Sequence, residues 1–148
     1  MGWHDSMIHG ISFNADGKNF VSDFILDIDY IFKWVTPEPP SEYCTFFVAP
    51  CTLVFSEFSN LKIGIETGRI LPIELEIADL TLVEEREITE MHRTKFWKIE
   101  THSGDILFEA TGFNQYVRQY PKHTNSQQLT MEERGGISFE KRSFTKKH

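Results

Sequence analysis

Hydrophobic and polar residues alternate along most of this chain. The clearest run covers residues 20–35, where the even positions from Phe24 to Trp34 are apolar and the odd positions include Asp27 and Asp29. A period of two is typical of a strand with one face on the core and the other in water. We therefore predict a long half-buried strand that ends at the prolines of residues 37–40, because proline cannot donate to a ladder.

Further extended runs follow, and only one stretch has helical character. Residues 129–134 predict a single helical turn with Thr130 and Glu133 as a weak capping box, stopped by Gly135 and Gly136. In the run 94–101, Phe96 and Trp97 are neighbours and so face opposite ways, and a four-residue loop at 102–105 joins this run to the next as a hairpin. The predicted strands are 43–58 with an interruption at Pro50, 61–65, 70–77, 81–88, 94–101, 106–116 and a last candidate at 137–144.

These elements predict an all-β fold. About eight to ten strands at this spacing favour an antiparallel β-sandwich or a flattened barrel, with at most one short helix near the C-terminus. The chain has 148 residues, which suits one domain over residues 1–148, with a basic tail that we expect to fray from about residue 140.

Charge is distributed unevenly along the chain. The formal net charge is -7, but residues 1–117 carry -11 and residues 118–148 carry +4. An acidic body repels phosphates, so we expect no nucleic-acid partner. The basic tail is interpreted as neutralising its own acidic body, with an anionic surface as the alternative.

The cysteines and the hydrophobic runs indicate where in the cell the protein is located. Cys44 and Cys51 are too far apart in one extended segment for a disulfide, and free buried thiols fit a reducing cytoplasm. No apolar run reaches the roughly 18 residues of a membrane-spanning helix, so we expect no membrane partner. The N-terminus has no secretory signal pattern.

Two acidic or histidine-containing motifs could carry chemistry. Asp27 and Asp29 point the same way on a strand and could share Mg²⁺ or Mn²⁺, or act as an acid–base pair; the alternative is a solvent-exposed acidic face. At the N-terminus, His4 and Asp5 are candidate acid–base groups or metal ligands, with Trp3 and His9 as candidate ligand-binding residues. There the alternative is a first strand whose Trp3 packs in the core.

Two further features suit ligands. Arg134, Gly135 and Gly136 could cradle an anion with backbone N–H groups, or they form a tight turn into a closing strand. The chain is rich in aromatic residues, which could stack on a sugar or base but more often fill a β core. No P-loop, Cys-x-x-Cys, Gly-x-Ser-x-Gly or Gly-x-Gly-x-x-Gly motif is present.

The opening Trp-His-Asp-x-x-Ile-His-Gly of residues 3–10 and the late Glu-Arg-Gly-Gly-Ile-Ser-Phe of residues 133–139 carry a resemblance. They resemble a family of small, uncharacterised bacterial proteins predicted to be cytoplasmic. The resemblance covers most of the chain and implies no activity, cofactor or site residue. Small acidic bacterial proteins of this size include toxin-neutralising immunity proteins, which is an association by size and charge.

Three functions stay open at this point. The leading hypothesis is a non-enzymatic interaction module, immunity-like in role, whose acidic sheet surface meets a basic protein partner. The alternative is a small enzyme or ligand binder in which His4 and Asp5 converge with Asp27 and Asp29 as an acid–base or divalent-metal site; no other cofactor is indicated. The third is a homodimer formed by pairing of edge strands.

Overall fold

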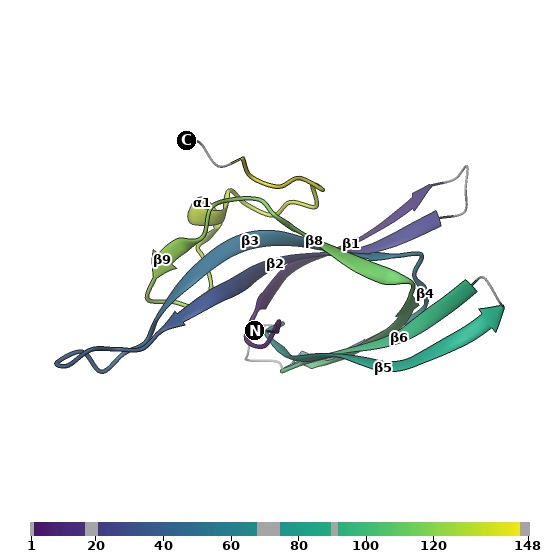
Figure 1. Ribbon diagram of the computed structural model, residues 1–148, viewed down its shortest axis with the longest axis horizontal. Helices are drawn as coiled ribbons and strands as arrows, with labels where there is room; N and C mark the ends of the chain where they lie inside the picture. The colour runs from purple at the N-terminus through teal and green to yellow at the C-terminus, as the bar shows by residue number, and fades with distance from the viewer. Residues whose placement is uncertain (1, 17–20, 68–74, 90–91, 146–148) are drawn as a thin grey trace.

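The computed structural model describes residues 2–16, 21–67, 75–89 and 92–145, which form two antiparallel sheets. Sheet A has the order β1-β2-β3-β8, with β9 also paired to β3, and sheet B has the order β4-β7-β6-β5. Figure 1 shows the two sheets facing each other, with the C-terminal part of the chain on the far side of sheet A. The strands are β1 (Met7–Asp16), β2 (Val21–Val35), β3 (Thr45–Ser56), β4 (Ser59–Ile65), β5 (Ile77–Thr89), β6 (His92–Thr101), β7 (Gly104–Ala110), β8 (Gly112–Val117) and β9 (Lys122–Thr124).

The predicted all-β class is confirmed, and the sheets are open rather than closed into a barrel. The run predicted as one strand over 106–116 is two strands, because the chain leaves sheet B after Ala110 and enters sheet A at Gly112. The predicted hairpin exists, but β7 already begins at Gly104, so the loop is shorter than expected. The strand predicted at 137–144 is not formed, and the one predicted at 70–77 lies mostly outside the described residues.

The main core lies between the sheets and is built from the apolar face of β2. Phe24, Leu26 and Ile28 are fully buried and pack with apolar side chains of β3, β6 and β7. The Phe24 and Phe55 rings of sheet A each contact the Phe108 ring of sheet B, with centroids 5.0 and 4.7 Å apart. The period of two in β2 therefore predicts the core face correctly from Phe24 to Ile28, but not at the end of the strand, where Phe32 and Trp34 are exposed and Ile31 is buried.

Pro50 lies inside β3 rather than interrupting it. Residue 50 pairs with Asp29 of β2, and its carbonyl accepts a hydrogen bond from the Arg118 backbone. On that side β3 changes neighbour, from β9 at residues 46–48 to β8 at residues 51–56. A missing N–H costs no ladder bond at such a change, which explains why proline is tolerated here.

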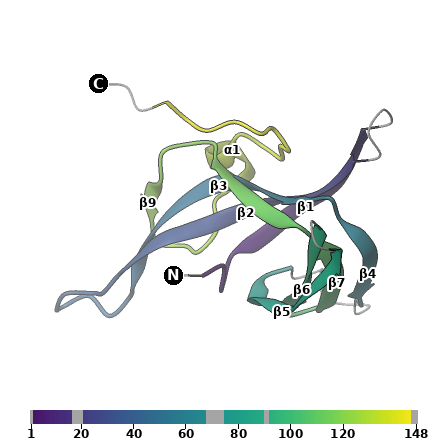
Figure 2. The same cartoon turned by 45° about the vertical axis from the view of Figure 1, so that its right-hand side comes forward.

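Residues 118–145, called the C-terminal segment below, cover the outer face of sheet A (Figure 2). A second small core of Ile31, Phe46, Val48 and Leu129 lies beneath this segment. At Gly10 of β1, an added Cβ would come 2.8 Å from the Phe139 ring, so glycine permits the close approach. The backbone of Phe144 still donates to Val117 of β8, so the expected fraying from about residue 140 is wrong as far as residue 144.

The helical turn predicted at 129–134 is the single turn α1 (Met131–Arg134). Thr130 caps it by accepting from the Glu133 backbone, and the Glu133 carboxylate accepts from the Thr130 backbone, which confirms the capping box. Gly135 ends the turn at a φ of 74°, and Gly136 follows at 82°, a region that glycine adopts without strain. These caps fix where the Arg134 side chain leaves the backbone.

Candidate functional site

Asp27 and Asp29 lie on the outer face of β2, and both side chains are completely buried. The interpretation of this face as solvent-exposed is therefore wrong: the C-terminal segment covers it. Asp27 accepts from Arg118 at 2.7 Å, from Arg134 through two bonds of 2.6 and 2.8 Å, and from the Ser138 backbone at 3.0 Å. Asp27 thus binds donors from three places along the C-terminal segment.

Asp29 is held by three donors of its own. Its carboxylate accepts from Arg134 Nε at 3.1 Å, from the Leu129 backbone at 2.9 Å and from His9 Nε2 at 2.7 Å. Arg134 thus bridges both carboxylates, and its side chain is also fully buried. Two carboxylates and two guanidinium groups balance in charge, as buried ions require.

The electrostatics of the cluster favour its charged form. Burial alone would raise the pKa of Asp27, but the hydrogen bonds from Arg134, Arg118 and the Ser138 backbone outweigh burial and hold that pKa below its ordinary value. Burial would likewise lower the pKa of Arg134, and its contacts with Asp27 and Asp29 raise it instead.

This arrangement leaves little capacity for chemistry on a ligand. A carboxylate offers about four lone-pair sites, and Asp27 fills four with donors from its own chain. A metal ion or substrate at Asp27 would have to displace an arginine. The cluster is therefore suited to fixing the C-terminal segment on sheet A.

The predicted convergence of His4 and Asp5 with Asp27 and Asp29 is not observed. His4 pairs with Asp5 at 2.8 Å and its side chain is 70% exposed, whereas His9 is the histidine that reaches Asp29. In the described part of the chain, no group of three or more His, Cys, Asp or Glu side chains is placed to hold a metal ion. The described residues therefore provide no set of ligands for the predicted divalent-metal site.

Trp3 packs at the edge of the main core, as the structural alternative predicted. Its ring meets Phe113 edge-on at 5.1 Å between centroids and also contacts Tyr30. Its indole N–H donates to Gln115 at 2.7 Å. These contacts place Trp3 in the packing between the sheets.

Within the Arg134-Gly135-Gly136 motif, Arg134 binds the carboxylate of Asp27, but the predicted glycine cradle is not formed: the N–H groups of Gly135 and Gly136 donate to carbonyls of α1. Arg134 and the Ser138 N–H both donate to Asp27. The predicted turn is formed, but no closing strand follows it among the described residues. With Lys141 paired to Asp23, these contacts confirm that the basic part of the chain neutralises its own acidic body.

A group of accessible acidic side chains lies on sheet B. Trp97 and Phe108 point toward sheet A, so by alternation their strand neighbours face away from it. In Figures 1 and 2 no described segment covers this outer face. We call it the acidic face. Among residues whose side chains the structure describes, its charged members are Asp79, Glu84, Glu100, Asp105, Glu109, Lys62 and Lys98.

Lys98 forms salt bridges on the acidic face. It pairs with Glu100 at 3.1 Å and lies 3.8 Å from Asp105. The hydrogen bond with Glu100 and the two nearby carboxylates raise the pKa of Lys98. Around Phe96, the neighbours across the sheet are Glu84 of β5 and Glu109 of β7.

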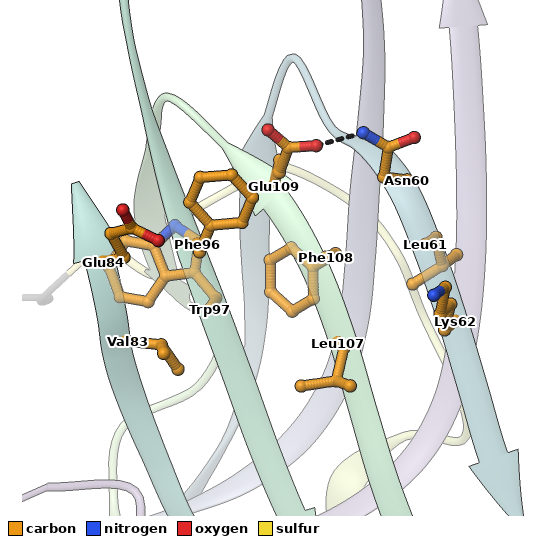
Figure 3. Close-up of a pocket in the computed structure, with 10 residues that line it drawn as sticks. All are labelled: Asn60, Leu61, Lys62, Val83, Glu84, Phe96, Trp97, Leu107, Phe108 and Glu109. Carbon is orange, nitrogen blue, oxygen red and sulfur yellow. Dashed lines mark hydrogen bonds between the residues drawn. The ribbon is translucent and has the colours of Figure 1, made fainter. Parts of the chain in front are cut away.

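A groove of about 630 Å³ lies at the part of the acidic face around Phe96. Figure 3 shows the Phe96 ring between Glu84 and Glu109, and the Glu109 carboxylate accepts from the side chain of Asn60. Leu107 and Val83 line the groove and are 42% and 61% exposed. All of its described lining residues belong to sheet B, and they include Trp97 and Phe108, whose side chains are part of the core between the sheets.

No family model, curated protein or solved structure matches this chain, so its function is inferred from the site geometry. Among the described residues, no helix has the length and apolar character needed to cross a membrane. Cys44 and Cys51 are both free; Cys51 is buried as expected, whereas Cys44 is exposed. Burial raises the pKa of Cys51 to about 12, which makes this thiol inert.

Sequence reasoning missed both Arg118 and the groove. Arg118 carries no motif, and its partner Asp27 lies 91 positions earlier in the chain. The groove has a weak signal: Phe96 and Trp97 are consecutive in a strand, so one of the two rings must face away from the core. That outward ring, opposite two glutamates, marks the groove.

Proposed function

We propose that this protein is a non-enzymatic binding module that holds a basic protein partner on the acidic face of sheet B. The observation that carries the proposal is the distribution of charge: among the side chains of this face that the structure describes, the five carboxylates outnumber the two lysines. Complementary charge steers a basic partner and raises its association rate. A toxin-neutralising protein would use such a surface.

The apolar part of the face supports the same proposal. Leu107 and Val83 are exposed on a groove that no described segment fills. An accessible apolar strip with a polar rim is typical of protein-binding surfaces. Charge would bring the partner to the face, and burial of this strip would hold it there.

The enzyme alternative receives less support from the geometry. Asp27 and Asp29 are buried under the C-terminal segment and bonded within the chain, and the exposed His4 pairs with Asp5 instead. The homodimer remains a proposal through the edge strands β4 and β5 of the open sheet B. We place the protein in the cytoplasm, where the two thiols stay reduced.

A pull-down from the host's own extract tests the proposal. The wild-type protein serves as bait beside a charge-reversed variant, Glu84→Lys with Glu109→Lys. We expect the wild type to retain a basic protein at about 50 mM salt and to release it at about 500 mM, because salt screens exposed charges. The charge-reversed bait should not retain it.

A matched control has the same change in net charge on another surface. Glu132→Lys with Glu140→Lys alters two exposed residues of the C-terminal segment and should retain the same partner as the wild type. Recovery of the same proteins by the wild type and by the variant at residues 84 and 109 would contradict the proposal.

A further inference from the structure

We propose that the C-terminal segment is a strap that opens from sheet A as one unit while the two sheets stay folded. This opening is independent of the proposed function, because it takes place on the opposite outer face of the sandwich (Figure 1). It would uncover Asp27 and Asp29, which the arginines of the segment occupy in the closed state. Three features support it: packing outside the main core, short backbone attachments, and anchors joined through the buried aspartates.

The segment is packed outside the main core. Among the described residues, that core contains no side chain from residues 118–145. The segment instead buries Leu129, in the small core with Ile31, Phe46 and Val48 of sheet A. Figures 1 and 2 show it on the side of sheet A that faces away from sheet B. The two sheets therefore keep their shared core when the segment leaves, and only the small core loses its cover.

The backbone attachments of the segment to the sheets are short. β9 pairs with β3 over three residues, the Arg118 N–H donates to Pro50, and the Phe144 N–H donates to Val117. The turn α1 is hydrogen-bonded within the segment itself. In contrast, β2 and β3 are paired on both sides. A segment with few bonds to the rest of the fold opens at a lower free energy than central strands do.

The buried aspartates join anchors that lie far apart along the segment. Asp27 accepts from Arg118 at the start of the segment and from the Ser138 N–H near its end. Between them, Arg134 donates to both Asp27 and Asp29. Groups in one hydrogen-bond network are energetically coupled, and release of one anchor leaves buried charges without compensation. We therefore expect the anchors to separate together, which makes the segment one cooperative unit.

Hydrogen exchange of the full chain, followed by NMR at about pH 7, tests the proposal. The N–H groups of Leu129, Ser138 and Phe144 all donate to sheet A, at separate points along the segment. We expect these three amides to share one protection factor. It should be at least about tenfold smaller than those of Leu26 in β2 and Ile99 in β6, which exchange only when a sheet unfolds.

Asp27→Asn tests whether the anchors act together. The N–H groups of Leu129 and Phe144 have acceptors other than Asp27, so a purely local role of Asp27 would leave their exchange unchanged. We expect the substitution to accelerate exchange at both amides by the same factor, about a hundredfold or more, because Arg118 loses its buried carboxylate partner. Asp105→Asn, the matched control on the acidic face, should leave both amides unchanged.

Asp23→Asn is a milder variant that keeps the test decisive if Asp27→Asn does not fold. It removes the partner of Lys141 at the edge of the segment and should accelerate exchange at the same amides by a shared factor of about two to five. Protection of Leu129 and Phe144 equal to that of the central strands in the wild type would overturn the proposal. Acceleration at one of these two amides without the other would overturn it as well.

Discussion

At the scale of single residues, the Asp27 carboxylate accepts four hydrogen bonds from its own chain. It is fully buried, and both of its oxygens accept from the C-terminal segment. Removing one partner of a buried charged pair leaves the other charge without compensation, and the cost exceeds the value of the pair itself. Asp27 therefore stabilises the fold because it compensates the buried charges of Arg118 and Arg134.

Replacing Asp27 by asparagine should lower the free energy of unfolding by about 3–5 kcal/mol at pH 7, because the buried Arg118 loses its carboxylate partner and Arg134 keeps only that of Asp29. Urea denaturation measures the change. Asp23→Asn is the matched control, since Asp23 lies on the same strand and pairs with the more exposed Lys141. A surface pair of that kind contributes about 1 kcal/mol or less. Equal effects of the two substitutions would contradict the assigned role of Asp27.

The lowered pKa of Asp27 also predicts how stability depends on pH. Its folded pKa is below the ordinary value of 3.8, so the unfolded chain takes up the proton first as pH falls. The contribution of Asp27 is fully present above about pH 4 and is lost as pH falls through the folded pKa. The unfolding free energies of the wild type and Asp27→Asn should therefore converge below about pH 4, as acid titrations with urea would show; a constant difference down to pH 2 would count against it.

At the scale of elements, β9 pairs part of the C-terminal segment with β3, and side-chain contacts order the rest of it. Its anchors on sheet A are the carboxylates of β2, the small core around Leu129 and the backbone bond from Phe144 to Val117. The capping box around Thr130 fixes the turn from which Arg134 projects. The turn and the buried cluster thus depend on each other.

Thr130→Ala should lower stability by about 1 kcal/mol, because the cap satisfies an N–H group of the first turn. Thr130→Ser keeps the hydroxyl and should remain close to the wild type. Thermal unfolding of the three proteins compares them directly. The same loss in both variants would show that the methyl group, and not the cap, matters.

The strands could be predicted from the sequence where their signal lies within a few neighbouring residues. The alternation in β2 identifies its core face, and Thr130 with Glu133 identifies the cap, because both signals lie within a few residues. The covering of Asp27 and Asp29 could not be predicted, since Arg118 and Arg134 lie about a hundred positions later in the chain. Only the contrast between an acidic body and a basic tail hinted that one would neutralise the other.

At the scale of the whole molecule, the two outer faces of the sandwich are used differently. Asp27 and Asp29 on sheet A are fully buried, whereas the outer face of sheet B carries exposed carboxylates such as those of Glu84 and Asp105. The net charge of -7 is thus distributed unequally over the surface, and we propose that the carboxylates of sheet B meet a partner. This difference between the faces is the central claim about function.

Mapping the binding surface by NMR tests that claim most directly. Amide chemical shifts of the isotope-labelled protein are followed while hexa-arginine is added at low salt and then reversed with high salt. We predict that the shifts cluster at Glu84, Phe96, Leu107 and Glu109 and disappear in the variant with Glu84→Gln and Glu109→Gln. Shifts that cluster on the C-terminal segment, or no shifts at any peptide concentration, would contradict the assignment of sheet B as the binding face.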